Sequence, residues 1–209
     1  MSPAAGRTRG NRAWVTSDTR PYPPGVSDFT EPAIGRRAEA TAYRFLDTLS
    51  YVRVPGSATD DRVSVVEMHL RAGHAPPMHV HDGADETIHV LDGGVTVHTA
   101  DDARSLTAGD SVVLPRGEEH SLVADEQSVI LASTAPAGFG EFVTAVGEPT
   151  EEGTVPTTPP SEDAIGQVNA LAGDHGIEIV GPPPAARDGR RSTHLTGQKE
   201  RARPRGAGS

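Results

Sequence analysis

The stretch GHAPPMHVHDGADETIHVLDG, residues 73–93, decides the fold of this chain. It carries two histidines separated by one residue, His79 and His81, and then a glutamate, Glu86. Side chains at positions i and i+2 of a β-strand point to the same face of a sheet, so both imidazoles should point the same way. The polar, glycine-containing residues 82–85 predict a turn. We therefore expect Glu86 to begin a strand beside the strand of the two histidines.

The run that follows Glu86 has the character of a half-buried strand. Ile88 and Val90 share the parity of Glu86, which indicates an inward apolar face. The sequence Asp-Gly-Gly at residues 92–94 then separates this run from another strand-like run at residues 95–99, and such a separation predicts a β-hairpin.

A second stretch, GDSVVLPRGEEH at residues 109–120, ends in a third histidine of interest, His120. Its residues 115–119 predict a turn, and His120 begins the strand-like run that follows. A side chain from a distant strand that closes over the first three is what the interior of a barrel can provide. Three imidazoles and one carboxylate suit a divalent first-row metal ion. The candidate metal ligands are therefore His79, His81, Glu86 and His120.

These two stretches resemble the two sequence motifs of the cupin family, most closely those of small single-domain cupins similar to quercetin dioxygenase. The motif positions are Gly73, His79, His81, Glu86, Gly93, Gly109, Pro115, Gly117 and His120. The chain departs from the family pattern at Ala124, where an asparagine that is not a ligand usually stands. The resemblance covers roughly residues 40–182, and it implies an all-β fold, a jelly-roll β-barrel.

The order of strands and turns along the chain predicts where the barrel lies. Many short strands at regular spacing indicate a sandwich or barrel, and we expect it at residues 40–149. Residues 150–181 should form a linker and a short helix. Residues 1–39 are expected to be a partly disordered extension and residues 182–209 a disordered basic tail, because both ends are rich in Arg, Gly and Pro and poor in aromatic residues.

Ser161 is the predicted N-cap of that helix, which should run through Leu171. Ile165, Val168 and Leu171 lie on one face at helical spacing, and Gly173 is a stop signal. We expect this face to pack against the barrel or against a partner subunit.

Composition excludes several other classes of protein. The chain has 29 acidic and 19 basic residues, a net charge of −10, and its acidic residues are concentrated between the two basic ends, so nucleic acid is not an expected partner. It has 0 cysteines, which excludes disulfides and thiolate metal sites. No apolar run approaches the roughly 18 residues of a membrane span. No apolar segment follows the basic N-terminus, so we expect a cytoplasmic protein.

The other histidines carry no such signal. His89 lies three residues from Glu86 and should therefore face outward, and His69 lies opposite a core face of Val66, Met68 and Leu70. Four further histidines have no partner at a ligand-like spacing: His74, His98, His175 and His194.

The resemblance implies a metal-dependent dioxygenase that acts on an enolisable aromatic molecule of the flavonol type, with a small-molecule substrate and dioxygen as partners. It implies that His79, His81, Glu86 and His120 hold the metal and that Glu86 is also catalytic, as the acceptor of a substrate proton. The ion is one of Fe, Ni, Co, Mn, Cu or Zn, because ligand type alone does not choose among them. A homodimer is also implied.

Three alternatives stay open at this point. The same site would serve a non-oxidative isomerase, cyclase or decarboxylase. A non-catalytic cupin that binds a small molecule would share the fold, and so would a barrel whose metal site is structural.

Overall fold

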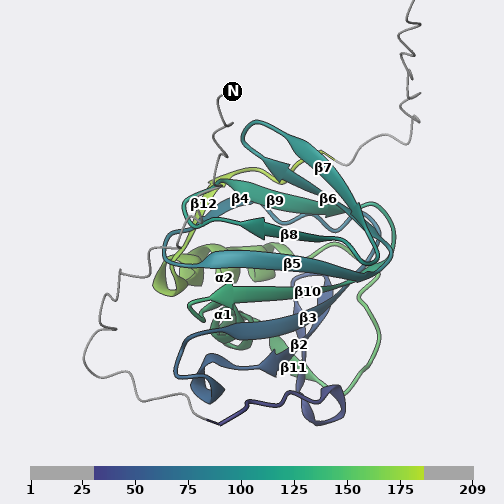
Figure 1. The fold of residues 1–209 in the computed structure, drawn as a ribbon. Helices are drawn as coiled ribbons and strands as arrows, with labels where there is room; N and C mark the ends of the chain where they lie inside the picture. Colours follow the sequence, from purple (N-terminus) through teal and green to yellow (C-terminus); the bar gives the residue numbers. More distant parts are fainter. Residues whose placement is uncertain (1–30, 186–209) are drawn as a thin grey trace, which may run out of the picture.

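Two antiparallel sheets face each other in the computed structural model, which describes residues 31–185 (Figure 1). The seven-stranded sheet has the order β11-β1-β2-β3-β10-β5-β8. Its strands are β1 (Ala42–Phe45), β2 (Thr48–Val54), β3 (Ser64–Leu70), β5 (Asp85–Asp92), β8 (Ser111–Leu114), β10 (Ser128–Ala135) and β11 (Glu148–Thr150). The five-stranded sheet has the order β12-β4-β9-β6-β7. Its strands are β4 (Met78–His81), β6 (Gly94–Thr99), β7 (Ala103–Thr107), β9 (His120–Ala124) and β12 (Ile177–Gly181).

The core lies between the two sheets, on the faces that the alternation of the sequence predicts. Val66 and Leu70 of β3 are fully buried, and so is Val90 of β5. Val95 and Val97 of β6 face them from the other sheet and are buried as well. The prediction of an all-β, two-sheet fold from short alternating strands is therefore confirmed.

Gly93 permits the tight turn between β5 and β6. Its φ is +75°, a conformation that L-residues rarely adopt, and a Cβ atom there would lie 2.6 Å from the carbonyl oxygen of Gln127. Glycine at this motif position is therefore a steric requirement of the fold.

Two helices cover one end of the sheets. Helix α1 (Phe139–Val146) buries Phe142 and Val143 against the core. Helix α2 (Glu162–Leu171) begins at Ser161, whose hydroxyl oxygen accepts a hydrogen bond from the Ala164 amide at 3.2 Å. The 3-10 helices are Arg37–Glu39, Gly56–Ala58 and Ala172–His175.

Helix α2 presents a narrower apolar face than its sequence predicts. Val168 is buried in the core, whereas Ile165 is 44% exposed. The helix lies beside α1 (Figure 1), and Val168 and Leu171 pack against the core whereas Ile165 does not, so the expected three-residue face is correct for two residues.

One prediction about neighbouring strands is wrong. Strand β4, which carries His79 and His81, does not lie beside β5, which carries Glu86, because the two belong to different sheets. The polar residues between them cross from one sheet to the other. Sequence alternation predicts the face on which a side chain lies but not the sheet, and a short turn can serve either connection.

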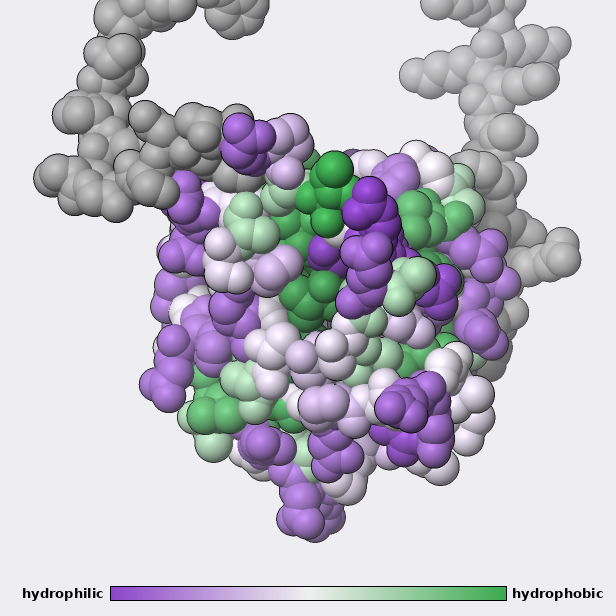
Figure 2. All heavy atoms as spheres, turned by 90° about the horizontal axis from the view of Figure 1, so that it is seen from below, coloured by the Kyte–Doolittle hydropathy of each residue, from purple (hydrophilic) through white to green (hydrophobic). Residues whose placement is uncertain are grey.

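Figure 2 shows one face of the molecule, on which hydrophobic side chains gather near the middle within a border of hydrophilic ones. Within residues 31–185, no helix is both long and apolar enough to cross a membrane. The predictions of disorder concern mainly residues 1–30 and 186–209, which lie outside the described residues.

Candidate metal centre

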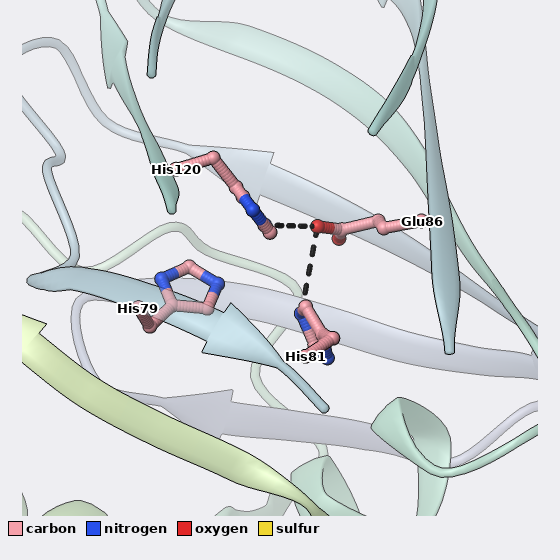
Figure 3. Close-up of side chains that lie close together, drawn as sticks. All are labelled: His79, His81, Glu86 and His120. Carbon is pink, nitrogen blue, oxygen red and sulfur yellow. Dashed lines mark hydrogen bonds and ion pairs between the residues drawn. The ribbon is translucent and has the colours of Figure 1, made fainter. Parts of the chain in front are cut away.

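The structure brings the four predicted ligands into one cluster between the sheets (Figure 3). His79 and His81 come from β4, His120 from the start of β9, and Glu86 from the facing sheet. One ligand atom of each residue lies within 4.8 Å of those of the other three. Opposite ligands of an ion at about 2.1 Å are about 4.2 Å apart, so the cluster is close to the size that an ion requires.

Local pairing fixes the three histidines relative to one another. His79 and His120 are direct partners across β4 and β9. The amide of Gly117, in the turn before β9, donates a 3.0 Å hydrogen bond to the carbonyl oxygen of His81. This hydrogen bond joins the turn of the second motif to the strand of the first motif, next to the candidate ligands.

Main-chain carbonyl groups orient two of the imidazoles. The Nδ1–H of His79 donates to the Pro77 carbonyl oxygen at 2.9 Å, and that of His120 donates to the Glu118 carbonyl oxygen at 2.8 Å. Each of these bonds directs the Nε2 atom of its ring toward the cluster. Metal-bound histidines commonly have their second nitrogen held in this way.

His81 supplies the clearest sign that the cluster suits a cation. Its Nε2 atom is buried and has no hydrogen-bond partner among residues 31–185. The nearest carboxylate oxygen, Glu86 Oε2, lies at 3.6 Å, beyond hydrogen-bond length. A buried ring nitrogen without a partner costs free energy unless another group binds it, and a metal ion bound there would remove that cost.

Glu86 carries the negative charge of the cluster. It is 6% exposed, and its Oε2 atom accepts a 2.9 Å hydrogen bond from His120 Nε2. Burial alone would raise the pKa of Glu86, but the hydrogen bond from His120 and the adjacent His81 ring outweigh burial and hold the pKa well below its usual range. Glu86 is therefore a carboxylate at neutral pH.

The same interactions set the charge of the histidines. Burial lowers the pKa of His79 to about 4, and the neighbouring His120 adds to this effect. Burial would lower the pKa of His120 too, but its hydrogen bond to Glu86 outweighs burial and raises it. His79 is thus neutral and able to ligate, whereas a metal ion would replace the proton that His120 shares with Glu86.

An exposed ion pair connects two of the segments that carry the candidate ligands. Arg116, in the turn before β9, donates from Nε and Nη2 to the Asp85 carboxylate at 3.0 and 3.1 Å. These hydrogen bonds lower the pKa of Asp85 to about 2. Because Asp85 precedes Glu86 and Arg116 lies near His120, the pair connects the segments that carry two of the four ligands.

The cluster lies at the wall of a mainly apolar cavity inside the barrel. His79, Glu86 and His120 line it together with apolar side chains that include Phe45, Met68, Leu70, Ile88, Leu122, Ile130, Phe139 and Phe142. The volume of the cavity, as the space open to the centre of a water molecule, is about 70 Å³, which is room for several water molecules.

A second polar group of this cavity was missed in the sequence. His74 is 3% exposed and lines the cavity, and its ring is bonded to Asp47, which is also 3% exposed. These two residues lie 27 positions apart and follow no motif, so no spacing signal links them. Asp47 lies in the connection between β1 and β2, and the alternation of a strand does not predict which side chains of a turn are buried.

Comparisons with known proteins agree with this architecture. The pattern of a family described as "Cupin domain" matches residues 66–132, which include all four candidate ligands. The chain is 27% identical over 119 residues to quercetin 2,3-dioxygenase from Bacillus subtilis (strain 168). That match covers 56% of this chain but only 35% of the relative, so the chain spans about a third of the relative's length.

Similar solved structures include KdgF from a Halomonas species, with 20% identity and a TM-score of 0.46 over 50% of this chain and 94% of that one. An RmlC-like cupin from Shewanella frigidimarina has 17% identity and a TM-score of 0.46, over 51% and 93% of the two chains. A predicted oxalate decarboxylase from Thermotoga maritima has 19% identity and a TM-score of 0.46, over 50% and 99%. Residues 66–132 of this chain therefore carry a cupin domain, and the match to the curated relative agrees with it.

Proposed function

We propose that this protein is a metal-dependent dioxygenase that acts on an enolisable aromatic molecule of the flavonol type. The observation that carries the proposal is the cluster of three histidines and one carboxylate at the wall of a mainly apolar cavity. The similarity to quercetin 2,3-dioxygenase supports the choice of reaction, although it covers only part of that protein.

His79, His81, Glu86 and His120 would hold the ion. When bound, a divalent first-row ion acts as a Lewis acid that favours the ionised form of a substrate hydroxyl. Three neutral imidazoles and one carboxylate leave one net positive charge on a divalent site, which suits the binding of an anionic oxygen. The two carbonyl groups that accept from His79 and His120 keep the ring nitrogens directed at the ion.

Glu86 would accept the proton of the substrate hydroxyl. It is buried at the cavity wall and ionised, which gives it the position and charge state of a general base. Its 2.9 Å contact with His120 orients the carboxylate in the cluster. Glu86 would thus both bind the ion and accept the proton, and a neutral amide at this position would do both poorly.

The apolar wall would orient the rings of the substrate and exclude water. Phe45 packs edge-on against Phe139 and Phe142, with ring centroids 6.1 and 5.6 Å apart. Phe139 also packs edge-on against His81 at 6.3 Å, so aromatic side chains reach the metal cluster itself. An aromatic substrate would extend this edge-on packing.

An oxygen electrode tests the proposal. The purified protein is stripped of metal, loaded separately with each of the six candidate ions, and mixed with 3-hydroxyflavone. We expect dioxygen uptake with at least one redox-active ion, loss of uptake in Glu86→Gln, and full uptake in the outer-face control His89→Ala. Consumption of the flavonol without dioxygen uptake would favour a non-oxidative isomerase or decarboxylase. If the protein takes up none of the six ions, the proposal that it is a metal-dependent enzyme is refuted.

We also propose that the protein is a cytoplasmic homodimer with a small molecule as its substrate. The dimer and the location follow from the family resemblance and from the composition of the chain.

A further inference from the structure

His74 and Asp47 give the cavity a second polar site, remote from the metal cluster. We propose that the imidazole of His74, oriented by Asp47, accepts a hydrogen bond from a hydroxyl group of the substrate. This inference rests on the proposed function, because it describes the same substrate at its other end. The substrate would be a mainly apolar molecule with a metal-binding oxygen at one end and a free hydroxyl at the other.

The hydrogen bonds of the pair determine which ring nitrogen is free. Asp47 Oδ2 accepts from Arg71 Nε at 2.6 Å, and Asp47 Oδ1 lies 2.5 Å from His74 Nδ1. A carboxylate is only an acceptor, so the proton in the second contact belongs to Nδ1. In the neutral ring Nε2 then carries a lone pair, and it has no other hydrogen-bond partner among residues 31–185.

Burial explains why the pair is held in one orientation. Burial would raise the pKa of Asp47, but the hydrogen bond from His74 Nδ1–H and the charge of Arg71 outweigh burial and lower it. The backbone of His74 is fixed as well, because its carbonyl oxygen accepts from the Ala124 amide at 2.9 Å. His74 is therefore attached to both sheets, through its carbonyl oxygen to Ala124 of β9 and through its imidazole to Asp47 in the β1–β2 connection.

Strand register places His74 and Asp47 away from the candidate metal ligands. Ala124 lies four residues beyond His120 on β9, a separation of about 13 Å along the strand. In the facing sheet, Asp47 precedes Thr48, which pairs with Leu70 at the end of β3, whereas Glu86 pairs with Thr134, which pairs with Ser64 at its start. Both sheets thus separate the two polar sites along the strands, and apolar side chains line the cavity with them.

A polar atom in such a wall discriminates between ligands more strongly than apolar contacts do. A ligand with a hydroxyl at this end would satisfy Nε2, whereas one with only carbon would displace water from Nε2 and leave it unpaired. The pair should therefore favour hydroxylated substrates over otherwise identical ones.

The competing explanation is that the pair only ties two loops together. His74→Asn separates the two roles, because the asparagine Nδ2–H can replace Nδ1–H as a donor to Asp47 while nothing replaces Nε2. His89→Asn is a matched control: the Nδ1 atom of His89 also meets a side-chain oxygen, Ser111 Oγ at 2.6 Å, but His89 does not line the cavity.

The test compares 3-hydroxyflavone with 3,4′-dihydroxyflavone, which differ by one hydroxyl at the far end of the phenyl ring. Binding to zinc-loaded protein is followed by fluorescence titration under argon, and metal content is measured for each variant. We expect wild type and His89→Asn to bind the dihydroxy compound about three- to tenfold more tightly. In His74→Asn this preference should vanish while metal content and melting temperature stay close to those of wild type.

Equal affinity of the wild type for both compounds, or a preference that persists in His74→Asn, would refute the proposed role of His74. Neither result would refute the flavonol proposal. Failure of both flavonols to bind would overturn the flavonol proposal together with this one. A binding preference that depends on His74, together with no dioxygen uptake in the oxygen-electrode test, would support this inference and refute only the dioxygenase reaction.

Discussion

Replacing Glu86 by glutamine should weaken metal binding at least a hundredfold while the barrel stays folded. Glutamine has nearly the same shape as glutamate. Its Oε1 can still accept the hydrogen bond that His120 Nε2 donates to Glu86 Oε2 over 2.9 Å in the wild type. The substitution removes the negative charge of the cluster. At an effective dielectric constant of about 20, a unit charge attracts a dication about 2 Å away by roughly 17 kcal/mol, of which a neutral amide recovers part. A loss of about 2.7 kcal/mol, a hundredfold, is therefore a lower bound.

Thermal unfolding with and without metal measures this loss. An ion at 1,000 times its Kd stabilises the folded protein by about 4.1 kcal/mol. For a domain of this size that corresponds to a rise in Tm of roughly 8–16 °C. At the same free concentration, a site weakened a hundredfold would be stabilised by about 1.4 kcal/mol, and its Tm would rise by roughly 3–6 °C.

Glu67→Gln is the matched control. Glu67 is also buried, but it lies on the face of β3 opposite to the core, where it contacts Arg53 and His69. Its replacement should lower Tm equally in chelator and in metal, so the rise caused by metal is unchanged. A rise in Glu86→Gln as large as that in wild type would refute the assignment of Glu86 as the charged ligand.

Three further predictions follow from the same geometry. The double variant His79→Ala/His120→Ala should lose at least nine-tenths of its metal by plasma mass spectrometry, and a variant that keeps stoichiometric metal would contradict the site. Asp47 has a lowered folded pKa, so its contribution to stability is present above the unfolded value of about 3.9 and is lost as the pH falls through the folded value. The difference between the urea midpoints of wild type and Asp47→Asn should therefore be largest at pH 6 and should shrink as the pH falls below the unfolded value, whereas a constant difference would exclude this linkage. Light scattering should give the mass of a dimer, and a monomer would count against the expected assembly.

The strands and the ligand cluster could be predicted because both depend on short-range pattern. Alternation places every second side chain of β5 inward, and the buried positions Glu86, Ile88 and Val90 follow it. The turns that flank the strands contain glycine and proline at positions where the backbone needs them, and the predicted run at residues 95–99 lies within one residue of β6 (Gly94–Thr99). The candidate ligands follow the same short-range pattern, because two of them lie on one strand and each of the others lies at or next to the start of a strand.

Features that depend on contacts between distant segments could not be predicted. No local signal states that β4 and β5 belong to different sheets, because their short connection is compatible with a hairpin as well as with a crossing. The contact of His74 with Asp47 depends on how the β1–β2 connection folds toward the β3–β4 loop. Leu46, whose φ is +56°, breaks what reads as one strand from Ala42 to Val54 into β1 and β2, and a leucine carries no turn signal.

The division of the candidate cluster between two sheets would make metal binding a property of the closed barrel. The three histidines are positioned by pairing within one sheet, and Glu86 is positioned by its pairing with Thr134 and Leu114 in the other. The four candidate ligands therefore converge only when the two sheets face each other, which neither the unfolded chain nor a separated sheet would allow. The binding free energy of an ion would then add to the apolar contact between the sheets, so metal should stabilise the barrel as a whole rather than the strand β4 alone.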